Sequence, residues 1–200
     1  ITNTPGVVSN ATADTAFLLM LAVARKAFYQ HKRILKGEWG FSAPTANLGI
    51  DIAGKTLGIW GLGNIGYVMA QRCKAAFNMK IIYSNRRRNE KAEKDLGAVF
   101  VSFDELLQQS DVISVHTNLT PETRERFNKD AFSRMKPASI FINTARGGIH
   151  NEADLVAALQ QGQIWGAGLD VTNPEPMKPD NPLLKMPTVA VLQHIGWATA

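Results

Sequence analysis

Three polar side chains in the second half of this sequence are of types that could act together in catalysis. Arg146, Glu175 and His194 each follow an apolar run, and these runs are residues 139–143, 165–171 and 188–192. A hydride that reaches a carbonyl carbon leaves a negative oxygen, and histidine is well suited to supply its proton near neutral pH. A neighbouring carboxylate raises the pKa of a histidine, and a guanidinium forks onto a substrate carboxylate. The residues therefore indicate hydride transfer, with His194 as general acid and base, Glu175 as its partner and Arg146 as the carboxylate clamp.

Each of these residues also has a structural interpretation. The histidine could be a loop residue with satisfied hydrogen bonds, the glutamate lies in a turn between two prolines, and the arginine could be a surface residue. The remaining histidines, His31, His116 and His150, lack this setting, and we interpret them as structural. His116 nevertheless ends a predicted strand and could line the ligand crevice at the carboxyl ends of the strands.

A glycine pattern earlier in the chain is typical of dinucleotide binding. Gly61-x-Gly63-x-x-Gly66 stands between the apolar run 57–60 and a predicted helix over 64–77. The first glycine permits a sharp turn, the second a close approach to a pyrophosphate, and the third tight packing of helix on strand. Free amides at the start of the helix, at Asn64 and Ile65, favour an anion. Such turns also occur in proteins that bind nothing, so the glycine pattern alone does not establish a dinucleotide site, and the neighbouring residues must be considered.

The end of the following strand indicates which dinucleotide is bound. NAD-binding chains usually place an acidic residue about 20 positions after the glycine turn, whereas this chain has Ser84-Asn85-Arg86-Arg87-Arg88. A carboxylate would repel a 2′-phosphate, and guanidinium groups grip it bidentately. We predict NADP (NADPH) as the cofactor, with NAD possible and with Ser84, Asn85, Arg86 and Arg87 around the phosphate. The alternative is a solvated charge run that opens a surface helix.

A second pattern in the sequence resembles a phosphate-binding loop but does not fit its structural context. Residues 49–56, which end in Gly54-Lys55-Thr56, match the loop of nucleoside triphosphatases. That loop must follow a strand and open a helix. Here it opens the apolar run 57–60, so no helix dipole would point at a phosphate, and we reject it.

Apolar runs and helical segments alternate along the chain, which predicts the α/β class. We expect strands over 56–60, 80–83, 98–101, 111–116, 139–143, 165–171 and 188–192. Helical crossovers between them predict a doubly wound parallel sheet, a Rossmann fold of about six to seven strands with helices on both faces. One such helix is expected over 90–96, and Ser102 and Glu105 form a capping box at the start of another.

The same pattern predicts a single domain. Residues 1–200 form one dinucleotide-binding domain, with a long buried helix and its lead-in over 1–37, a connector over 38–55 and the Rossmann core over 56–200. The helix is expected from about 13 to 35, with Asn10 or Thr12 as its cap.

Composition narrows the partners and the compartment. The chain carries a net charge of +5 and 45% hydrophobic residues, and its basic residues are spread out without interleaved aromatics, so we expect no nucleic-acid partner. A single cysteine, Cys73, indicates a reducing, cytoplasmic location. The longest apolar stretch, 16–24, is too short for a bilayer, which needs about 20 residues. It is apolar all round, which favours a homodimer. We predict no metal site and no membrane partner.

The motifs taken in order resemble those of a known family. The glycine turn, Asn143-Thr-Ala-Arg146-Gly147, Gly168-Leu-Asp170-Val171, Glu175-Pro176 and His194-Ile-Gly196 are similar, over nearly the whole chain, to the cofactor-binding domain of the D-isomer-specific 2-hydroxyacid dehydrogenases, as are Thr4-Pro-Gly-Val and Ala13-Asp14. The strand end 84–88 and the segment 170–184 most resemble NADPH-dependent glyoxylate/hydroxypyruvate reductases and 2-ketogluconate reductases. The resemblance implies a small 2-oxo acid as substrate, Arg146, Glu175 and His194 as catalytic residues, and Asn118, Thr144, Asp170 and Gly196 near the cofactor.

The sequence also departs from the family pattern. Asn118 and Gln193 stand where proline is usual, and Trp197 replaces a small residue and could narrow the substrate pocket. The family builds a substrate domain from flanking segments absent from these 200 residues, so we expect NADP(H) binding with little turnover. A dinucleotide-sensing, corepressor-like module of the same family is the alternative function.

Overall fold

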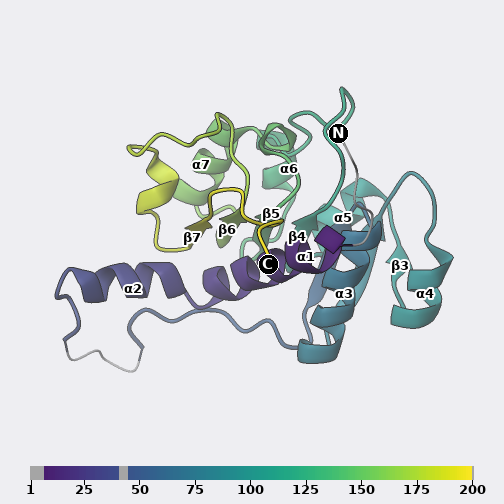
Figure 1. The fold of residues 1–200 in the computed structure, drawn as a ribbon, viewed down its shortest axis with the longest axis horizontal. Helices are drawn as coiled ribbons and strands as arrows, with labels where there is room; N and C mark the ends of the chain where they lie inside the picture. The colour runs from purple at the N-terminus through teal and green to yellow at the C-terminus, as the bar shows by residue number, and fades with distance from the viewer. Residues whose placement is uncertain (1–6, 41–44, 200) are drawn as a thin grey trace.

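A seven-stranded sheet, parallel throughout, forms the centre of the molecule (Figure 1). The computed structural model describes residues 7–40 and 45–199. The strand order is β3-β2-β1-β4-β5-β6-β7. The strands are β1 (Thr56–Trp60), β2 (Lys80–Ser84), β3 (Val99–Phe100), β4 (Val112–Val115), β5 (Ile140–Asn143), β6 (Gly166–Leu169) and β7 (Val189–Val191). The predicted fold class is confirmed, and each predicted strand is present with small changes at its ends.

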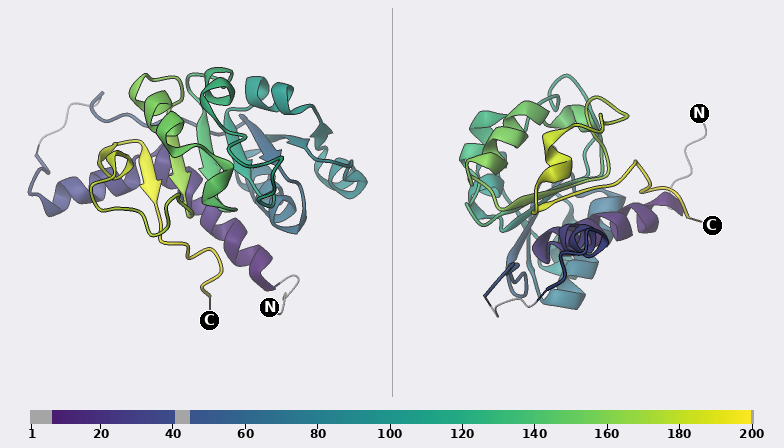
Figure 2. Two further views of the ribbon diagram at one scale, coloured as in Figure 1. Left: turned by 90° about the horizontal axis from the view of Figure 1, so that it is seen from above. Right: turned by 90° about the vertical axis from the view of Figure 1, so that its left-hand side faces the viewer.

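Helices cover both faces of the sheet, as the right-hand view of Figure 2 shows for α1 and α7. The helices are α1 (Val7–Ala24), α2 (Ala27–Leu35), α3 (Asn64–Phe77), α4 (Glu90–Leu96), α5 (Phe103–Gln109), α6 (Lys129–Ser133) and α7 (Glu152–Gln160), with short 3-10 turns at η1 (Gly147–Ile149) and η2 (Pro182–Lys185). One apolar core joins α1, α3 and α4 to the sheet, and a second joins α5, α6 and α7 to its other face. The strands are therefore buried on both sides.

Alternation along each strand divides the side chains between the two cores. On β5, Phe141 packs with α6 and α7, whereas its neighbours Ile140 and Ile142 pack with α1. Successive strand residues point to opposite faces, so continuous apolar runs are what a sheet covered on both faces requires. This is why these runs predicted strands correctly.

The N-terminal helical region differs from its prediction. We expected one long buried helix from about 13 to 35 capped by Asn10 or Thr12, but α1 begins at Val7 and ends at Ala24, so both residues lie inside it. Lys26 takes a left-handed conformation, φ 53°, and α2 begins after it with none of its residues buried. The buried interpretation therefore holds for α1 alone.

The connector explains the break. The amide of Ile50 donates to the carbonyl of Ala24 at 2.9 Å, taking the place of the next helical hydrogen bond. Gly49 permits this approach, since a Cβ there would lie 2.2 Å from the Ala24 oxygen. The described parts of the connector, 38–40 and 45–55, contain no helix or strand.

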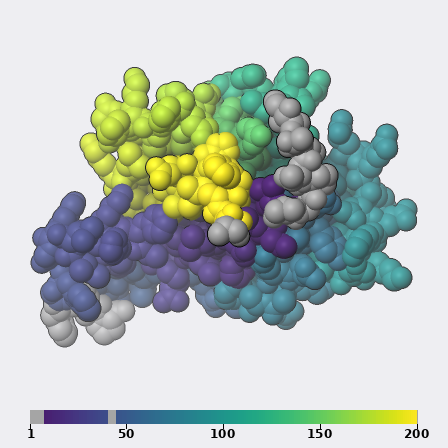
Figure 3. Space-filling view, viewed as in Figure 1, coloured from purple at the N-terminus to yellow at the C-terminus, as the bar shows by residue number. Residues whose placement is uncertain are grey.

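The two ends of the described chain meet at α1. The hydroxyl of Thr12 donates to the carbonyl of Gly196 at 2.9 Å. The space-filling view shows the C-terminal residues lying over the first helix (Figure 3). No helix in residues 7–40 and 45–199 is long and apolar enough to cross a membrane. Thr4 to Gly6, part of the family resemblance, lie outside the described residues.

Candidate active site

The glycine turn between β1 and α3 has three distinct environments. Gly61 has φ 98°, and a Cβ there would lie 2.7 Å from the carbonyl carbon of His116. A Cβ on Gly66 would lie 2.7 Å from the oxygen of Gly61, so the helix packs directly on the turn. A Cβ on Gly63 would meet nothing within 4 Å. The first and third glycines therefore serve the fold, while the second leaves its surface open to a ligand.

The start of α3 is available to an anion. Gly63 is the residue before the helix, and no described side chain caps it. The backbone amides of Asn64 and Ile65 therefore lie at the positive end of the helix dipole without a side-chain acceptor. This is the arrangement expected of a diphosphate site.

Two asparagines after β2 hold the turn in place. Asn85 accepts a hydrogen bond from the amide of Leu62 at 2.6 Å, and Asn89 donates to the carbonyl of Leu62 at 2.9 Å. We predicted Asn85 as a cofactor contact, and its amide is engaged with the backbone although the residue lines the cleft. Sequence reasoning missed Asn89. Its place before Glu90 signals a helix cap, which it is, but does not indicate the second bond.

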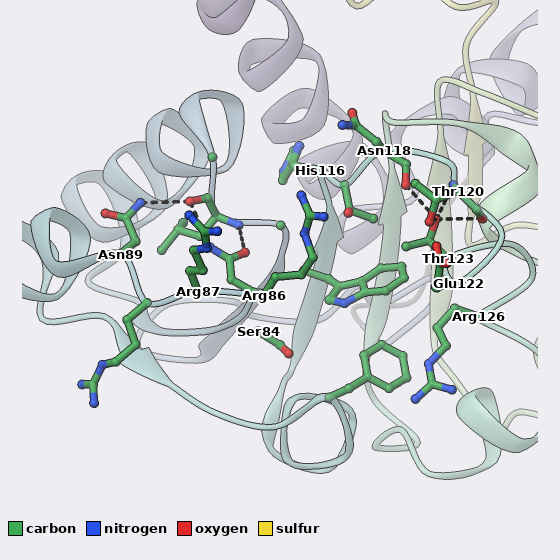
Figure 4. Close-up of a pocket in the computed structure, with 18 of the residues that line it drawn as sticks. Ser84, Arg86, Arg87, Asn89, His116, Asn118, Thr120, Glu122, Thr123 and Arg126 are labelled. Atoms are coloured by element: carbon green, nitrogen blue, oxygen red, sulfur yellow. Dashed lines mark hydrogen bonds between the residues drawn. The ribbon is translucent and has the colours of Figure 1, made fainter.

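A cleft of about 1380 Å³ lies over the carboxyl ends of β1, β2 and β4 (Figure 4). Among the predicted cofactor residues, those lining it are Gly61, Gly63, Ser84, Asn85, Arg86, Arg87 and Asn118. Arg86 and Arg87 are exposed and form no ion pair with a described residue. Arg88 is engaged elsewhere, since its Nη2 lies 2.8 Å from Oε2 of Glu93. Two guanidinium groups are therefore free to meet an anion in this cleft.

A second cavity of about 530 Å³ adjoins the first. The two share His116, Thr117 and Asn118, which follow β4. The predicted residues that line the second cavity are Ile65, Asn118, Thr144, Arg146, Asp170, His194 and Gly196. The fold thus brings the proposed acid and the proposed clamp into one cavity beside the larger cleft. Trp197 lines this cavity, as its predicted effect on substrate size requires.

The histidine and glutamate of the predicted pair are in contact. Nδ1 of His194 lies 2.7 Å from Oε1 of Glu175, and both side chains are partly exposed. His194 has φ 58°, a backbone conformation that residues other than glycine seldom adopt. Since Nδ1 is engaged by the carboxylate, Nε2 is the nitrogen left to exchange a proton with a ligand.

A buried carboxylate fixes the segment that carries this histidine. Asp170, 1% exposed, accepts hydrogen bonds from the amides of Ile195 at 2.9 Å and Gly196 at 2.8 Å. A Cβ on Gly196 would lie 2.8 Å from Oδ2 of Asp170, so only glycine fits this approach. The resemblance placed Asp170 and Gly196 near the cofactor, and the structure shows a further contribution of both to positioning His194.

Hydrogen bonds from the side chain of Asn143 hold the turn that carries Arg146. Asn143 donates to the carbonyl of Arg146 at 3.0 Å and accepts from the amide of Ala145 at 3.0 Å. His150 lies 3.1 Å from the same Asn143 side chain through its Nδ1. Burial lowers the pKa of His150 to about 4, so the ring is neutral near pH 7. Sequence reasoning missed this network, because residue types alone do not reveal which polar side chains are buried together.

Two further groups in the second cavity bear on its ligand. The Thr144 hydroxyl is buried and has no hydrogen-bond partner among the described residues, and a buried polar atom without a partner is costly. His116 donates or accepts a hydrogen bond with the hydroxyl of Ser114 at 2.8 Å, and burial lowers its pKa to about 4. A polar ligand reaching Thr144 would satisfy it. The open glycine turn, the uncapped helix and this hydroxyl all fit a dinucleotide that spans both cavities.

The sheet order, which reverses at β1 and β4, and the glycine turn at that point define a Rossmann dinucleotide-binding domain. Residues 17–196 match the family model described as "D-isomer specific 2-hydroxyacid dehydrogenase, NAD binding domain". The chain belongs to this family, which confirms the resemblance seen in the sequence, and its cofactor is a nicotinamide dinucleotide.

Curated and solved relatives agree with this assignment. The chain is 45% identical over 197 residues, 98% of its length, to glyoxylate/hydroxypyruvate reductase B of Salmonella gallinarum, of which it covers 61%. The TT0316 protein of Thermus thermophilus is 42% identical with a TM-score of 0.92, over 99% of this chain and 61% of that one. A glyoxylate reductase from Paecilomyes thermophila is 43% identical with a TM-score of 0.88, over 98% and 58%. The chain thus spans about three fifths of the length of these relatives.

Proposed function

We propose that the protein containing this chain reduces a small 2-oxo acid to the D-2-hydroxy acid with NADPH. The observation that carries the proposal is the contact of His194 with Glu175, because His194 lines, together with Arg146, the cavity that adjoins the dinucleotide cleft. Glyoxylate, hydroxypyruvate and 2-ketogluconate are the candidate substrates. The names of the Salmonella and Paecilomyes relatives support the first two.

The residues divide the work of the reduction between binding and proton transfer. Arg146, exposed on its turn, binds the substrate carboxylate through its guanidinium and so fixes the carbonyl in the cavity. The reduced nicotinamide supplies the hydride when the cofactor is bound. His194 then gives its proton from Nε2 to the carbonyl oxygen, and Glu175 keeps the ring in position and stabilises its charged form. In the reverse direction the same histidine accepts the proton.

The preference for NADP rests on the cations of the larger cleft. Arg86 and Arg87 line it at the end of β2 and form no ion pair with a described residue. A 2′-phosphate carries nearly two negative charges near neutral pH, and two guanidinium groups can share them. NAD lacks this group and would offer neither arginine a phosphate contact at this position. We therefore expect NADP⁺ to bind more tightly than NAD⁺.

Steady-state kinetics of the full-length protein with the three candidate acids would test this function. We expect turnover with NADPH, loss of about 100-fold or more in kcat for His194→Asn, and unchanged NADPH binding in that variant. No turnover of any of the three acids by the unmodified protein would overturn the reductase proposal. A clear preference for NAD⁺ in a titration of this chain would instead favour the dinucleotide-sensing module and overturn the NADP assignment.

Three other expectations remain predictions. The 200 residues alone should bind NADP(H) with little turnover, since closure by a substrate domain excludes water and completes such sites. A homodimer and a cytoplasmic location are likewise proposed. Sedimentation of the full-length protein would test the first of these two, and localisation of a tagged protein the second.

A further inference from the structure

Two carboxylates, Glu90 and Glu122, line the larger cleft together with its arginines. The loop between β4 and α6 forms the wall that faces the end of β2, and Glu122 lies on this wall (Figure 4). The loop is held in shape by the Thr123 hydroxyl, which donates to the carbonyl of Asn118 at 2.7 Å and accepts from the amide of Thr120 at 2.8 Å. Glu122 is therefore placed at the cleft by a fixed turn.

The Glu122 carboxylate is ionised near neutral pH and interacts with the charge of Arg86. Hydrogen bonding by the Thr120 side chain and by a backbone amide, together with the charge of Arg86, holds the pKa of Glu122 below its usual value. Arg86 forms no ion pair among the described residues, whereas the neighbouring Arg88 is bound by Glu93, and the charge of Glu90 adds to the rise in the pKa of Arg88. Of the two carboxylates that line the cleft, Glu122 is the one whose pKa is lowered by the charge of Arg86.

We infer that Glu122 is a specificity-determining residue that competes with the 2′-phosphate of the cofactor for Arg86. A phosphate that reaches Arg86 must approach this carboxylate, and two like charges repel. The repulsion lowers the affinity for NADP⁺ and leaves NAD⁺, which has a hydroxyl at this position, almost unaffected. The inference rests on the proposed use of Arg86 for the phosphate.

Both groups are exposed to solvent, so the effect is moderate. Solvent screens exposed charge pairs, and such a pair changes an affinity by roughly 1.4- to 5-fold. Glu122→Gln keeps the shape of the side chain and its ability to accept a hydrogen bond but removes the charge. We therefore expect it to tighten binding of NADP⁺ by about 2- to 5-fold, and to bring the chain closer to a strict NADP preference.

The test uses ligand pairs that differ only in the 2′-phosphate. Fluorescence or calorimetric titrations of the chain with NADP⁺, NAD⁺, 2′,5′-ADP and 5′-AMP would compare the wild type with Glu122→Gln. Glu125→Gln is the matched control, since it removes the same charge from the same loop outside the cleft. We expect tighter binding of NADP⁺ and 2′,5′-ADP only in Glu122→Gln, and a smaller gain at about 0.5 M salt, where charges are screened.

Arg86→Gln should reduce the gain, because the carboxylate and the phosphate then no longer compete for this cation and only Arg87 remains to bind the phosphate. Equal gains for NAD⁺ and 5′-AMP, an equal gain in Glu125→Gln, or no gain in Glu122→Gln would each overturn the inference. A wild-type preference for NAD⁺ would overturn the NADP assignment instead. A selective gain for 2′,5′-ADP in Glu122→Gln would still support the role of Glu122, so the two failures are distinguishable.

Discussion

Oδ2 of Asp170 accepts a hydrogen bond from the amide of Gly196 at 2.8 Å, and this contact joins the end of β6 to the segment that carries the proposed acid. Oδ1 of the same carboxylate accepts from the amide of Ile195. His194 precedes both amides, and its left-handed backbone is maintained by these bonds. The buried carboxylate is therefore a positioning group for His194.

Asp170→Asn should destabilise the chain and weaken catalysis together. An asparagine offers one acceptor oxygen where the two amides need two, and its amide group would face an N–H donor. We expect a loss of about 1–3 kcal/mol in the free energy of unfolding, measured by urea denaturation. Asp180→Asn, at an exposed site, should change it little. Equal stability of the two variants would contradict the role assigned to Asp170.

The glycine turn predicts opposite effects for two substitutions two residues apart. Gly61→Ala should cost about 1–3 kcal/mol or more, because φ is 98° and the new methyl would meet the backbone of His116. Gly63→Ala should leave stability within about 0.5 kcal/mol but weaken NADP⁺ binding by about tenfold or more, since its methyl would occupy the phosphate position. Thermal unfolding and nucleotide titration separate the two effects. Undiminished binding by Gly63→Ala would place the diphosphate elsewhere.

The sequence predicted most of the fold because its signals are local. The bounds of β1, α3 and α4 match the expected ranges, and the predicted capping box of Ser102 and Glu105 is present. The break after Ala24 could not be predicted, because neither residue of Arg25-Lys26 is a helix breaker and its cause is the amide of Ile50.

In the active site, too, local signals were predicted from the sequence and long-range contacts were not. Residues that follow strands were correctly placed near one another, since the carboxyl ends of parallel strands share one edge. The sequence did not reveal the hydrogen bonds that hold these residues in place. They are the bonds of Asn143 to the Arg146 carbonyl and to His150, and the bond of Thr12 to the Gly196 carbonyl. Each bond depends on which distant polar groups become buried together, and that is a property of the tertiary fold.

Glu175→Gln should lower turnover without changing nucleotide affinity. Glutamine can still accept a hydrogen bond from Nδ1 of His194 but cannot stabilise the charged ring. We expect kcat of the full-length protein to fall by at least about tenfold, while the Kd for NADPH stays the same. The nucleotide affinity is the internal control. A fall in affinity as large as the fall in kcat would indicate a structural role for this pair.

Cys73 should be inert in the folded protein. It is fully buried between Met20 and Met69, and burial raises the pKa of its thiol to about 12. The thiolate is the reactive form, so dithionitrobenzoate should label the native chain only as fast as the core opens. In urea the single thiol should react fully. Rapid labelling without denaturant would show that the core around α3 is open.

The pH dependence of stability should report the buried histidine under the Arg146 turn. Burial lowers the pKa of His150 from 6.5 to about 4, so between these values the unfolded chain binds a proton that the folded chain does not. The contribution of His150 to the free energy of unfolding is fully present above about pH 6.5 and is lost as the pH falls toward 4. The loss is about 1.4 kcal/mol per pH unit and roughly 3 kcal/mol in all.

Urea denaturation at several pH values would measure this slope for the wild type and for His150→Asn. The variant should be less stable at pH 7, because its shorter side chain fills the site less well, but its pH slope should be smaller by about one proton. His116 and the carboxyl groups whose pKa values are lowered, such as Glu105 and Asp111, contribute to the slope that remains. His31→Gln, at an exposed position, is the control and should leave the slope unchanged. Identical slopes in the wild type and His150→Asn would mean that His150 is already protonated in the fold, and the neutral bond to Asn143 would have to be abandoned.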